Sequence, residues 1–224
     1  MKRLLLAITC FSVLVFGINA IELSAGIGAD VGFIFTSTKT NIPQPYKSQL
    51  NSTLDNVKLT RWGISSFFDA QYIEANLGGK FFISKYSENG YIYEETTNFF
   101  NLGLKLKYPF KITEKISVFP LAGFDYSIFT SGKAKDNTGN ILIDRDDLLP
   151  SNRLDRFSIN LGIGGDFYVG QKLYIRGEFN YMFLLNTETQ KDAIAKIESL
   201  GYDLSIFQNG PVFRLAIGYR FFNK

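Results

Sequence analysis

The chain has 224 residues, of which 46% are hydrophobic and 16% aromatic, and its 24 lysines and arginines stand against 21 aspartates and glutamates. It contains no histidine, and its one cysteine is Cys10. This composition excludes catalysis with histidine as acid or base, serine–histidine and cysteine–histidine nucleophile pairs, and the common histidine or cysteine metal sites.

The first 20 residues have the three parts of a secretory signal peptide. Lys2 and Arg3 precede an apolar run, Leu4–Phe16, and the small residue Ala20 stands where cleavage is expected. The run is shorter than the roughly 20 residues that a spanning helix needs, which argues against a membrane anchor. We therefore expect residues 1–20 to be a cleaved signal peptide and residues 21–224 to form one domain.

Removal of the signal peptide would leave 22 basic and 21 acidic residues, because two of the 24 basic residues and none of the acidic ones lie in the first 20. A net charge this close to neutral gives no reason to expect nucleic acid as a partner.

From residue 21 onward, apolar and polar side chains alternate with a period of two, the pattern of strands with one apolar and one polar face. Eight segments show this alternation, and each is near the 9–11 residues with which a tilted strand crosses a bilayer. The segments cover residues 21–35, 61–70, 74–84, 100–108, 116–128, 157–169, 173–183 and 213–221.

Two features indicate that the apolar face meets lipid. The polar face is rich in glycine and carries charges at mid-strand, which suits a crowded lumen. The connections also alternate between short ones (71–72, 110–115, 170–172) and long ones (37–59, 85–97, 130–155, 185–209). Short periplasmic turns with long extracellular loops are typical of bacterial membrane barrels. We predict an all-β fold, an eight-stranded antiparallel up-and-down transmembrane β-barrel with long extracellular loops; a secreted soluble barrel is the alternative.

The predicted lumen carries charges of both signs. Eight strands enclose a space only wide enough for side chains, and charges held away from water need partners. A short turn at 170–172 would place Asp166 opposite Arg176, so that neutralising Asp166 would leave Arg176 unpaired, and barrel closure would bring Asp30 near Arg214. We hypothesise a salt-bridged plug, with a merely wet lumen or a narrow solute path as alternatives. The charged residues are Asp30, Lys80, Lys105, Lys107, Asp125, Asp166, Arg176, Glu178, Arg214 and Arg220.

Two of the predicted loops contain local motifs. Thr187 with Gln190 can form a capping box and Gly201 can end a helix, which predicts a short external helix over the barrel mouth. The segment Asp136–Asn140 is typical of a hairpin tip; its oxygen-rich side chains could also hold calcium, but the spacing does not match an EF-hand. We therefore expect no metal site, no cofactor and no catalytic residue.

The last segment carries the sharpest motif. Arg214, Ala216, Tyr219 and Phe221 are similar to the C-terminal signal read by the barrel-assembly machinery, in which a polar residue is followed two places on by glycine and then by aromatics. Ala216 replaces the glycine, and two residues follow the last aromatic. Over nearly all of residues 21–224, the chain resembles in architecture the small eight-stranded bacterial outer-membrane proteins of the OmpA, OmpX and opacity-protein type.

The resemblance implies a place in the bacterial outer membrane, contact with its lipid, and assembly by the barrel-assembly machinery. We expect a non-enzymatic, structural or surface-interaction (adhesin-like) role in which the external loops meet a host or envelope partner. A narrow channel, or a barrel that passes small molecules, is the alternative. An outer-membrane hydrolase is disfavoured because the chain has no histidine.

Overall fold

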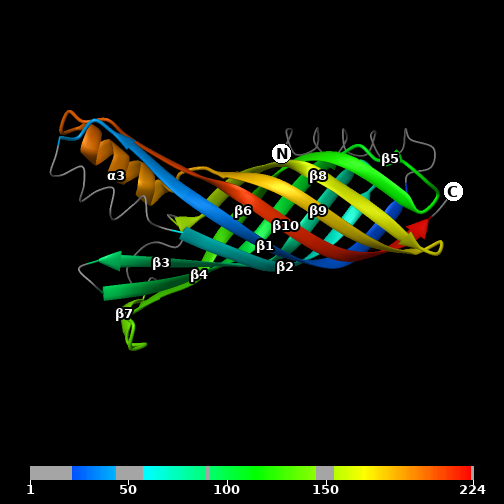
Figure 1. The fold of residues 1–224 in the computed structure, drawn as a ribbon, viewed down its shortest axis with the longest axis horizontal. Helices are drawn as coiled ribbons and strands as arrows, with labels where there is room; N and C mark the ends of the chain where they lie inside the picture. The colour runs from blue at the N-terminus through cyan, green and yellow to red at the C-terminus, as the bar shows by residue number, and fades with distance from the viewer. Residues whose placement is uncertain (1–21, 44–57, 89–90, 145–153, 223–224) are drawn as a thin grey trace, which may run out of the picture.

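The protein is a closed antiparallel β-barrel in a computed structural model that describes residues 22–43, 58–88, 91–144 and 154–222 (Figure 1). Each long strand pairs with its neighbours along the chain, and β1 pairs with β10 to close the ring. The long strands of this described part are β1 (Leu23–Thr40), β2 (Lys58–Ala70), β3 (Ile73–Glu88), β4 (Tyr91–Lys107), β6 (Ile116–Lys135), β8 (Arg156–Val169), β9 (Leu173–Leu184) and β10 (Leu204–Phe222). The predicted eight-stranded architecture is confirmed.

Three smaller elements accompany the barrel. The short strands β5 (Phe110–Lys111) and β7 (Ile141–Asp144) each pair with β6. Helix α3 (Glu188–Glu198) begins at a capping box between Thr187 and Gln190, as the sequence predicts. It buries none of its side chains, and it lies alongside the outer ends of β1 and β10 (Figure 1).

Along the strands, the apolar side chains are exposed and the polar ones are buried, which is the reverse of the pattern in a soluble protein. Ile27 on β1 is 66% exposed and Leu215 on β10 is 65% exposed, whereas Arg176 on β9 is 1% exposed. A soluble barrel would bury its apolar face, so this alternative does not fit. The exposed apolar belt is what a barrel needs when hydrocarbon is its solvent, and closure leaves no unpaired strand edge in that belt.

The connections at one end of the barrel are short, as predicted. The turn after β2 is made by Gln71 and Tyr72, with Gln71 at a positive φ of 54°. Gly170, at φ 77°, begins the turn between β8 and β9. The first residues of β1 and the last residues of β10 lie at this same end (Figure 1).

At the other end, the boundaries of the predicted loops are wrong. The range 85–97 is mostly strand, because β3 continues to Glu88 and β4 begins at Tyr91. Similarly, β6 runs on to Lys135 in the range 130–155, and β10 starts at Leu204 in the range 185–209. Near these strand ends the outward-facing residues become polar. The alternation of apolar and polar residues in the sequence therefore ends before the strand ends. Parts of the first and third predicted loops, 44–57 and 145–153, lie outside the described residues.

The strands are longer than a membrane crossing requires. β1 has 18 residues and β6 has 20. A strand of 18 residues is roughly 60 Å long and rises roughly 45 Å at a tilt of about 40°. Because the hydrocarbon core is about 30 Å thick, the outer ends project into water. They form two groups, which we call the β1–β10 extension and the β3–β4–β6 extension (Figure 1).

One close approach between β1 and β10 can be tested with a matched pair of glycines. A Cβ atom on Gly210 would lie 1.8 Å from the backbone oxygen of Phe33, whereas one on Gly177 would meet nothing within 4 Å. We expect Gly210→Val to lower the folded fraction several-fold after insertion into lipid vesicles, since the backbone cannot yield as a side chain does. Gly177→Val should fold like the parent. The measurement is the fraction of protein whose gel band shifts on boiling; equal fractions for both variants would contradict this packing.

Candidate functional site

The centre of the barrel interior is Arg176 on β9, which binds carboxylates from three other strands. Its Nε lies 2.6 Å from Asp166 Oδ1 on β8, its Nη2 lies 2.6 Å from Asp69 Oδ2 on β2, and its Nη1 lies 2.5 Å from Glu74 Oε2 on β3. A second contact joins Nη2 to Asp166 Oδ2 at 2.8 Å. The guanidinium thus uses its planar fork to hold β2, β3, β8 and β9 in one register.

Two further cations share the carboxylates around Arg176. Arg214 on β10 lies 2.5 Å from Glu74 and 3.2 Å from Glu178. Lys105 on β4 lies 2.5 Å from Glu178 and 3.4 Å from Glu74. Glu74 therefore receives three cations, and the network crosses the lumen between strands that are not neighbours in the sheet.

A second group lies further along the strands, toward the extensions. Arg61 on β2 pairs with Asp30 on β1 at 2.8 Å, and Lys80 on β3 pairs with Asp125 on β6 at 2.6 Å. The amides of Asn101 and Asn160 also donate to Asp125, at 3.3 and 3.1 Å. These bonds satisfy the lone pairs of the buried carboxylate that its lysine does not reach.

The opposite side of the network reaches the mouth of the barrel at the end with the short turns. Lys107 pairs with Asp69, and Arg220 pairs with Glu22. The guanidinium of Arg220 also stacks on the ring of Tyr168, 3.6 Å from its centroid. This stacking covers one face of the cation where the barrel opens to water.

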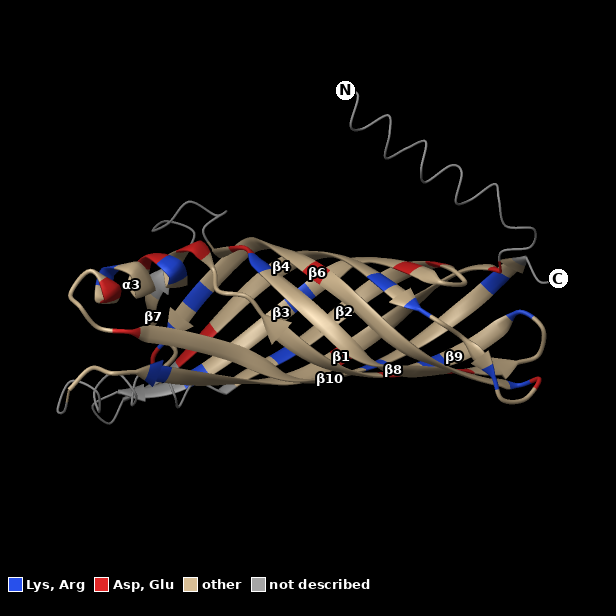
Figure 2. Cartoon of the chain, turned by 90° about the horizontal axis from the view of Figure 1, so that it is seen from above, with Lys and Arg blue, Asp and Glu red and all other residues tan. Residues whose placement is uncertain are grey.

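Charges of both signs fill the described part of the barrel, and Figure 2 shows both signs along the strands. Six buried carboxylates face the lumen: Asp30, Asp69, Glu74, Asp125, Asp166 and Glu178. Seven cations are buried with them: Arg61, Lys80, Lys105, Lys107, Arg176, Arg214 and Arg220. The seventh cation, Arg220, pairs with Glu22 at the mouth, and a further guanidinium, that of Arg156, lies against the rings of Phe82 and Phe99. Opposite charges at ion-pair distance offset the cost of holding one another away from water.

The structure buries all ten residues that the sequence singled out for the lumen: Asp30, Lys80, Lys105, Lys107, Asp125, Asp166, Arg176, Glu178, Arg214 and Arg220. Asp166 lies opposite Arg176, where the short turn places it. Asp30 does lie opposite Arg214 in the β1–β10 register, but its ion pair is with Arg61.

Sequence reasoning left Arg61, Asp69 and Glu74 out of the charge set, although all three stand on the polar face of their strands. The alternation was the signal that could have found them. The expectation that neutralising Asp166 leaves Arg176 unpaired is also wrong, because Asp69 and Glu74 remain bound to it.

Apolar side chains cover the central charges on both sides, more completely toward the extensions. Toward the extensions, rings of Phe82, Phe99 and Phe129 pack edge to face, with centroids 5.3 and 5.8 Å apart. Ile34, Leu59, Met182, Leu184 and Val212 complete this layer. Toward the end with the short turns, Phe67 and Tyr174 pack with Ala216.

The space left among the charges is small at the centre and wider at the end with the short turns, where Asp69, Lys107 and Arg176 line a hollow of about 190 Å³. The cavity bordered by Asp30, Lys80, Asp125 and Arg214 has a volume of about 20 Å³, which is room for about one water molecule. Within the described ranges, the charges at the centre of the interior are therefore closely packed.

The oxygen-rich loop segment is a hairpin tip. The Asp136 carboxylate accepts hydrogen bonds from the Thr138 hydroxyl at 2.7 Å and from the backbone N–H groups of Thr138 and Asn140, each at 2.9 Å. The bond from the Thr138 side chain, followed by the backbone bonds, lowers the pKa of Asp136. Gly139, at φ 87°, completes the turn. The Asp136 carboxylate thus accepts hydrogen bonds from residues of its own turn.

An eight-stranded barrel with an apolar exterior, a charged packed interior and short turns at one end is an integral outer-membrane β-barrel. The sequence matches the family of the outer membrane protein beta-barrel domain over residues 4–221. The chain belongs to this family, and it resides in the bacterial outer membrane, in contact with its lipid.

Solved structures that are similar to this chain have little sequence in common with it. Ail, the attachment invasion locus protein of Yersinia pestis, solved with the heparin analogue sucrose octasulfate, is 14% identical, with 90% of this chain and 100% of that chain covered and a TM-score of 0.35. Neisserial surface protein A is 14% identical, with 88% and 95% covered and a TM-score of 0.42. A major outer membrane protein from Thermus thermophilus is 13% identical, with 89% and 99% covered and a TM-score of 0.44. No curated protein matches the sequence.

Removal of the central cation tests the network. We expect Arg176→Met to destabilise the barrel by about 3–5 kcal/mol, because three buried carboxylates lose their shared partner. Lys85→Met, which removes the cation of the exposed Lys85–Glu94 pair, should cost less than about 1 kcal/mol. Urea unfolding in lipid vesicles, followed by Trp62 fluorescence, measures both. Similar midpoints for the two variants would show that the buried network does not hold the barrel together.

Proposed function

We propose that this protein is a non-enzymatic surface barrel whose extensions contact a host or envelope partner. The observation that carries the proposal is the change in the outward face of the strands. On β1 this face passes from Phe33 and Phe35 to Ser37 and Lys39, all four exposed. On β6 it passes from Ile128 to polar residues that end at Lys135. Strands that continue past the lipid with polar faces present a rigid surface to the outside.

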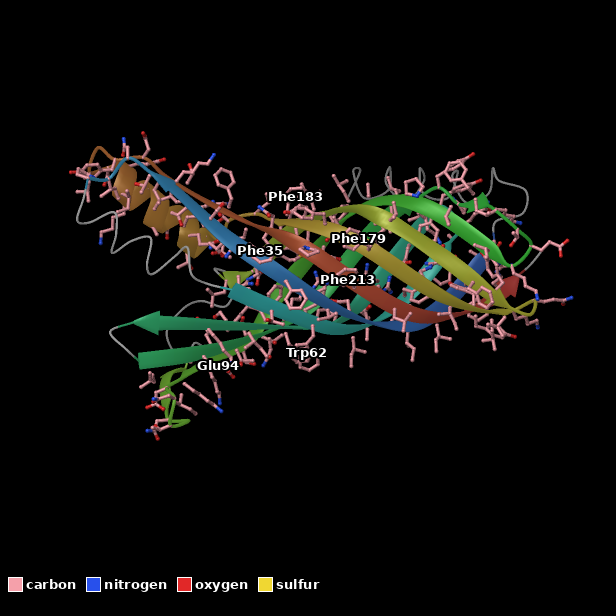
Figure 3. The ribbon with its side chains drawn as sticks, in the orientation of Figure 1. Phe35, Trp62, Glu94, Phe179, Phe183 and Phe213 are labelled. Atoms are coloured by element: carbon pink, nitrogen blue, oxygen red, sulfur yellow. The ribbon has the colours of Figure 1, made fainter. Side chains whose placement is uncertain are left out.

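The β3–β4–β6 extension offers a binding surface of suitable chemistry. A hollow of about 260 Å³ on its outward face is lined by residues of β4 and β6. Asn98 donates to the Ser131 hydroxyl at 2.8 Å across the two strands. Glu94, labelled in Figure 3, lies beside it and pairs with Lys85 on β3. Hydroxyl, amide, carboxylate and ammonium groups on a fixed sheet are suited to hydrogen bonding with a polar partner.

The interior supports a role without catalysis. Each of the six interior carboxylates has a lysine or arginine within ion-pair distance, so none is left free to act as a general base. The chain has no histidine to take that part.

The last strand supports assembly by the barrel-assembly machinery, which we propose as a further partner. Tyr219 and Phe221 point outward from β10 with ring centroids 5.6 Å apart, while Arg214 and Ala216 face the interior. The aromatic pair therefore lies on the face that a protein at the membrane can reach. The signal peptide proposed for residues 1–20 lies outside the described residues.

The channel alternative makes an opposite prediction. Because the centre of the charged interior has room for about one water molecule and an apolar layer covers it toward the extensions, we expect no discrete conductance steps from the refolded protein in a planar bilayer. A band that shifts on boiling would establish that the silent protein is folded. Reproducible steps from folded protein would replace the surface proposal with a channel.

Attachment tests the surface role directly. A bacterium that displays this protein should attach to cultured host cells, or to immobilised envelope polymers, several-fold better than one that lacks it. The double variant Lys85→Glu and Lys135→Glu reverses two exposed charges on the β3–β4–β6 extension, and we expect it to lose most of this gain.

The matched control is Lys115→Glu with Lys172→Glu, which makes the same charge change in the turns at the periplasmic end and should attach like the parent. Equal attachment by the extension variant and the parent would rule out this surface. Failure of the parent itself to raise attachment would rule out the adhesive role.

A further inference from the structure

We infer that the outer wall of the barrel holds one hydrocarbon chain of a membrane lipid in a groove that runs across β6, β8, β9, β10 and β1. The groove has a volume of about 970 Å³. The lining residues at its centre are Ile163 and Gly165 on β8, Gly177 and Phe179 on β9, and Phe213 and Leu215 on β10. All these residues alternate with the buried ones and face away from the lumen.

The floor of the groove is bare backbone. Gly165 lies opposite Gly177 in the β8–β9 register, so two neighbouring strands lack an outward side chain at the same level. A Cβ atom on Gly177 would meet nothing within 4 Å, and one on Gly165 would find its nearest neighbour, the backbone oxygen of Ser117, at 3.3 Å. Glycine in the middle of a strand often marks a place where another molecule approaches the backbone closely.

The walls are large apolar side chains. The rings of Phe179 and Phe213 lie 4.9 Å apart in a tilted pair on the outer surface (Figure 3). Ile163 and Leu215 are each 65% exposed, which makes them among the most prominent side chains of the belt. Walls that stand out beside a floor without side chains give the groove its depth.

The groove contains no polar side chain that a polar ligand could use. Asp30, Glu178 and Arg214 border it, but their side chains are buried on the lumen side and engaged in ion pairs there. The strand pairing occupies the backbone groups of the floor. The groove therefore suits an uncharged ligand that binds by dispersion contacts. A hydrocarbon chain in the groove would make the van der Waals contacts that Gly165 and Gly177, which have no side chain, cannot make.

The occupant is a lipid chain rather than a second copy of the protein. The groove is continuous with the lipid-facing belt, so hydrocarbon already surrounds it. If two copies met symmetrically at this face, concave surface would oppose concave surface and leave space unfilled. A flexible chain can follow a groove that crosses five strands, or roughly 19 Å at the usual strand spacing.

Native mass spectrometry tests the inference. Folded protein is released from micelles that contain phosphatidylethanolamine with sixteen-carbon chains, and the bound lipid is counted. We expect one lipid to remain on the parent and Gly177→Phe to retain several-fold less, because the ring fills the groove. Gly79→Phe on β3 is the control: this outward glycine has Phe81 as its nearest neighbour at 3.6 Å and lies outside the groove, so the lipid should remain.

A second measurement needs no change in the groove floor. The protein has a single tryptophan, Trp62, which is 42% exposed on the outer face of β2, and Phe213 is 49% exposed. In the variant Trp62→Phe with Phe213→Trp, the one indole stands in the groove wall. We expect phosphatidylethanolamine with brominated chains, titrated into the micelles, to quench it at a several-fold lower mole fraction than it quenches Trp62 in the parent.

Each remaining outcome decides against the inference. Equal lipid retention by the two phenylalanine variants, or equal quenching of the two indoles, would mean that chains contact this face only as they contact the rest of the belt. A dimer mass in the parent that disappears in Gly177→Phe would assign the groove to a second copy. None of these results depends on attachment to cells, so the surface proposal stands or falls separately.

Discussion

The rest of the barrel depends on the ion pairs that the guanidinium of Arg176 makes. This guanidinium joins carboxylates from β2, β3 and β8 to its own strand, β9. If any of these strands slipped by one residue, its buried charge would turn to the lipid face, since successive side chains point to opposite faces. The cost of an unpaired charge therefore specifies the register of four strands at once, which hydrophobic contacts with fluid lipid cannot do.

The apolar layers strengthen this network. Phe82, Phe99 and Phe129 keep water from the ion pairs on the side of the extensions. On the other side, the rings of Phe67 and Tyr174 lie against the guanidinium of Arg176. Attraction between opposite charges grows as the surrounding dielectric falls, but so does the cost of removing the charges from water. The net effect is favourable only when the charges have partners, and each of the six interior carboxylates has a lysine or arginine within ion-pair distance.

The sequence predicted the parts of this arrangement that depend on neighbouring strands. Period-2 alternation located the eight strands, and the short turn at 170–172 placed Asp166 opposite Arg176. The sequence could not predict contacts across the lumen. Glu74 on β3 meets Arg214 on β10 because the closed barrel is curved and its strands are staggered, and the pairing of two neighbouring strands does not reveal this. Strand ends were missed for another reason. Outside the lipid, both faces of a strand can be polar, so residues such as Lys85 and Lys135 continue a strand without the alternation that marks it.

Because the interior is filled with side chains, other molecules can bind this protein at its outer surfaces. In the lipid belt the outward face is apolar, and the one pair of facing glycines in the β8–β9 register, Gly165 and Gly177, interrupts it with a groove. Above the belt the same strands carry hydroxyl, amide and charged groups on a frame that the network around Arg176 keeps rigid. A partner that binds there meets a surface whose conformational entropy has already been lost in folding, so more of the contact energy appears as affinity.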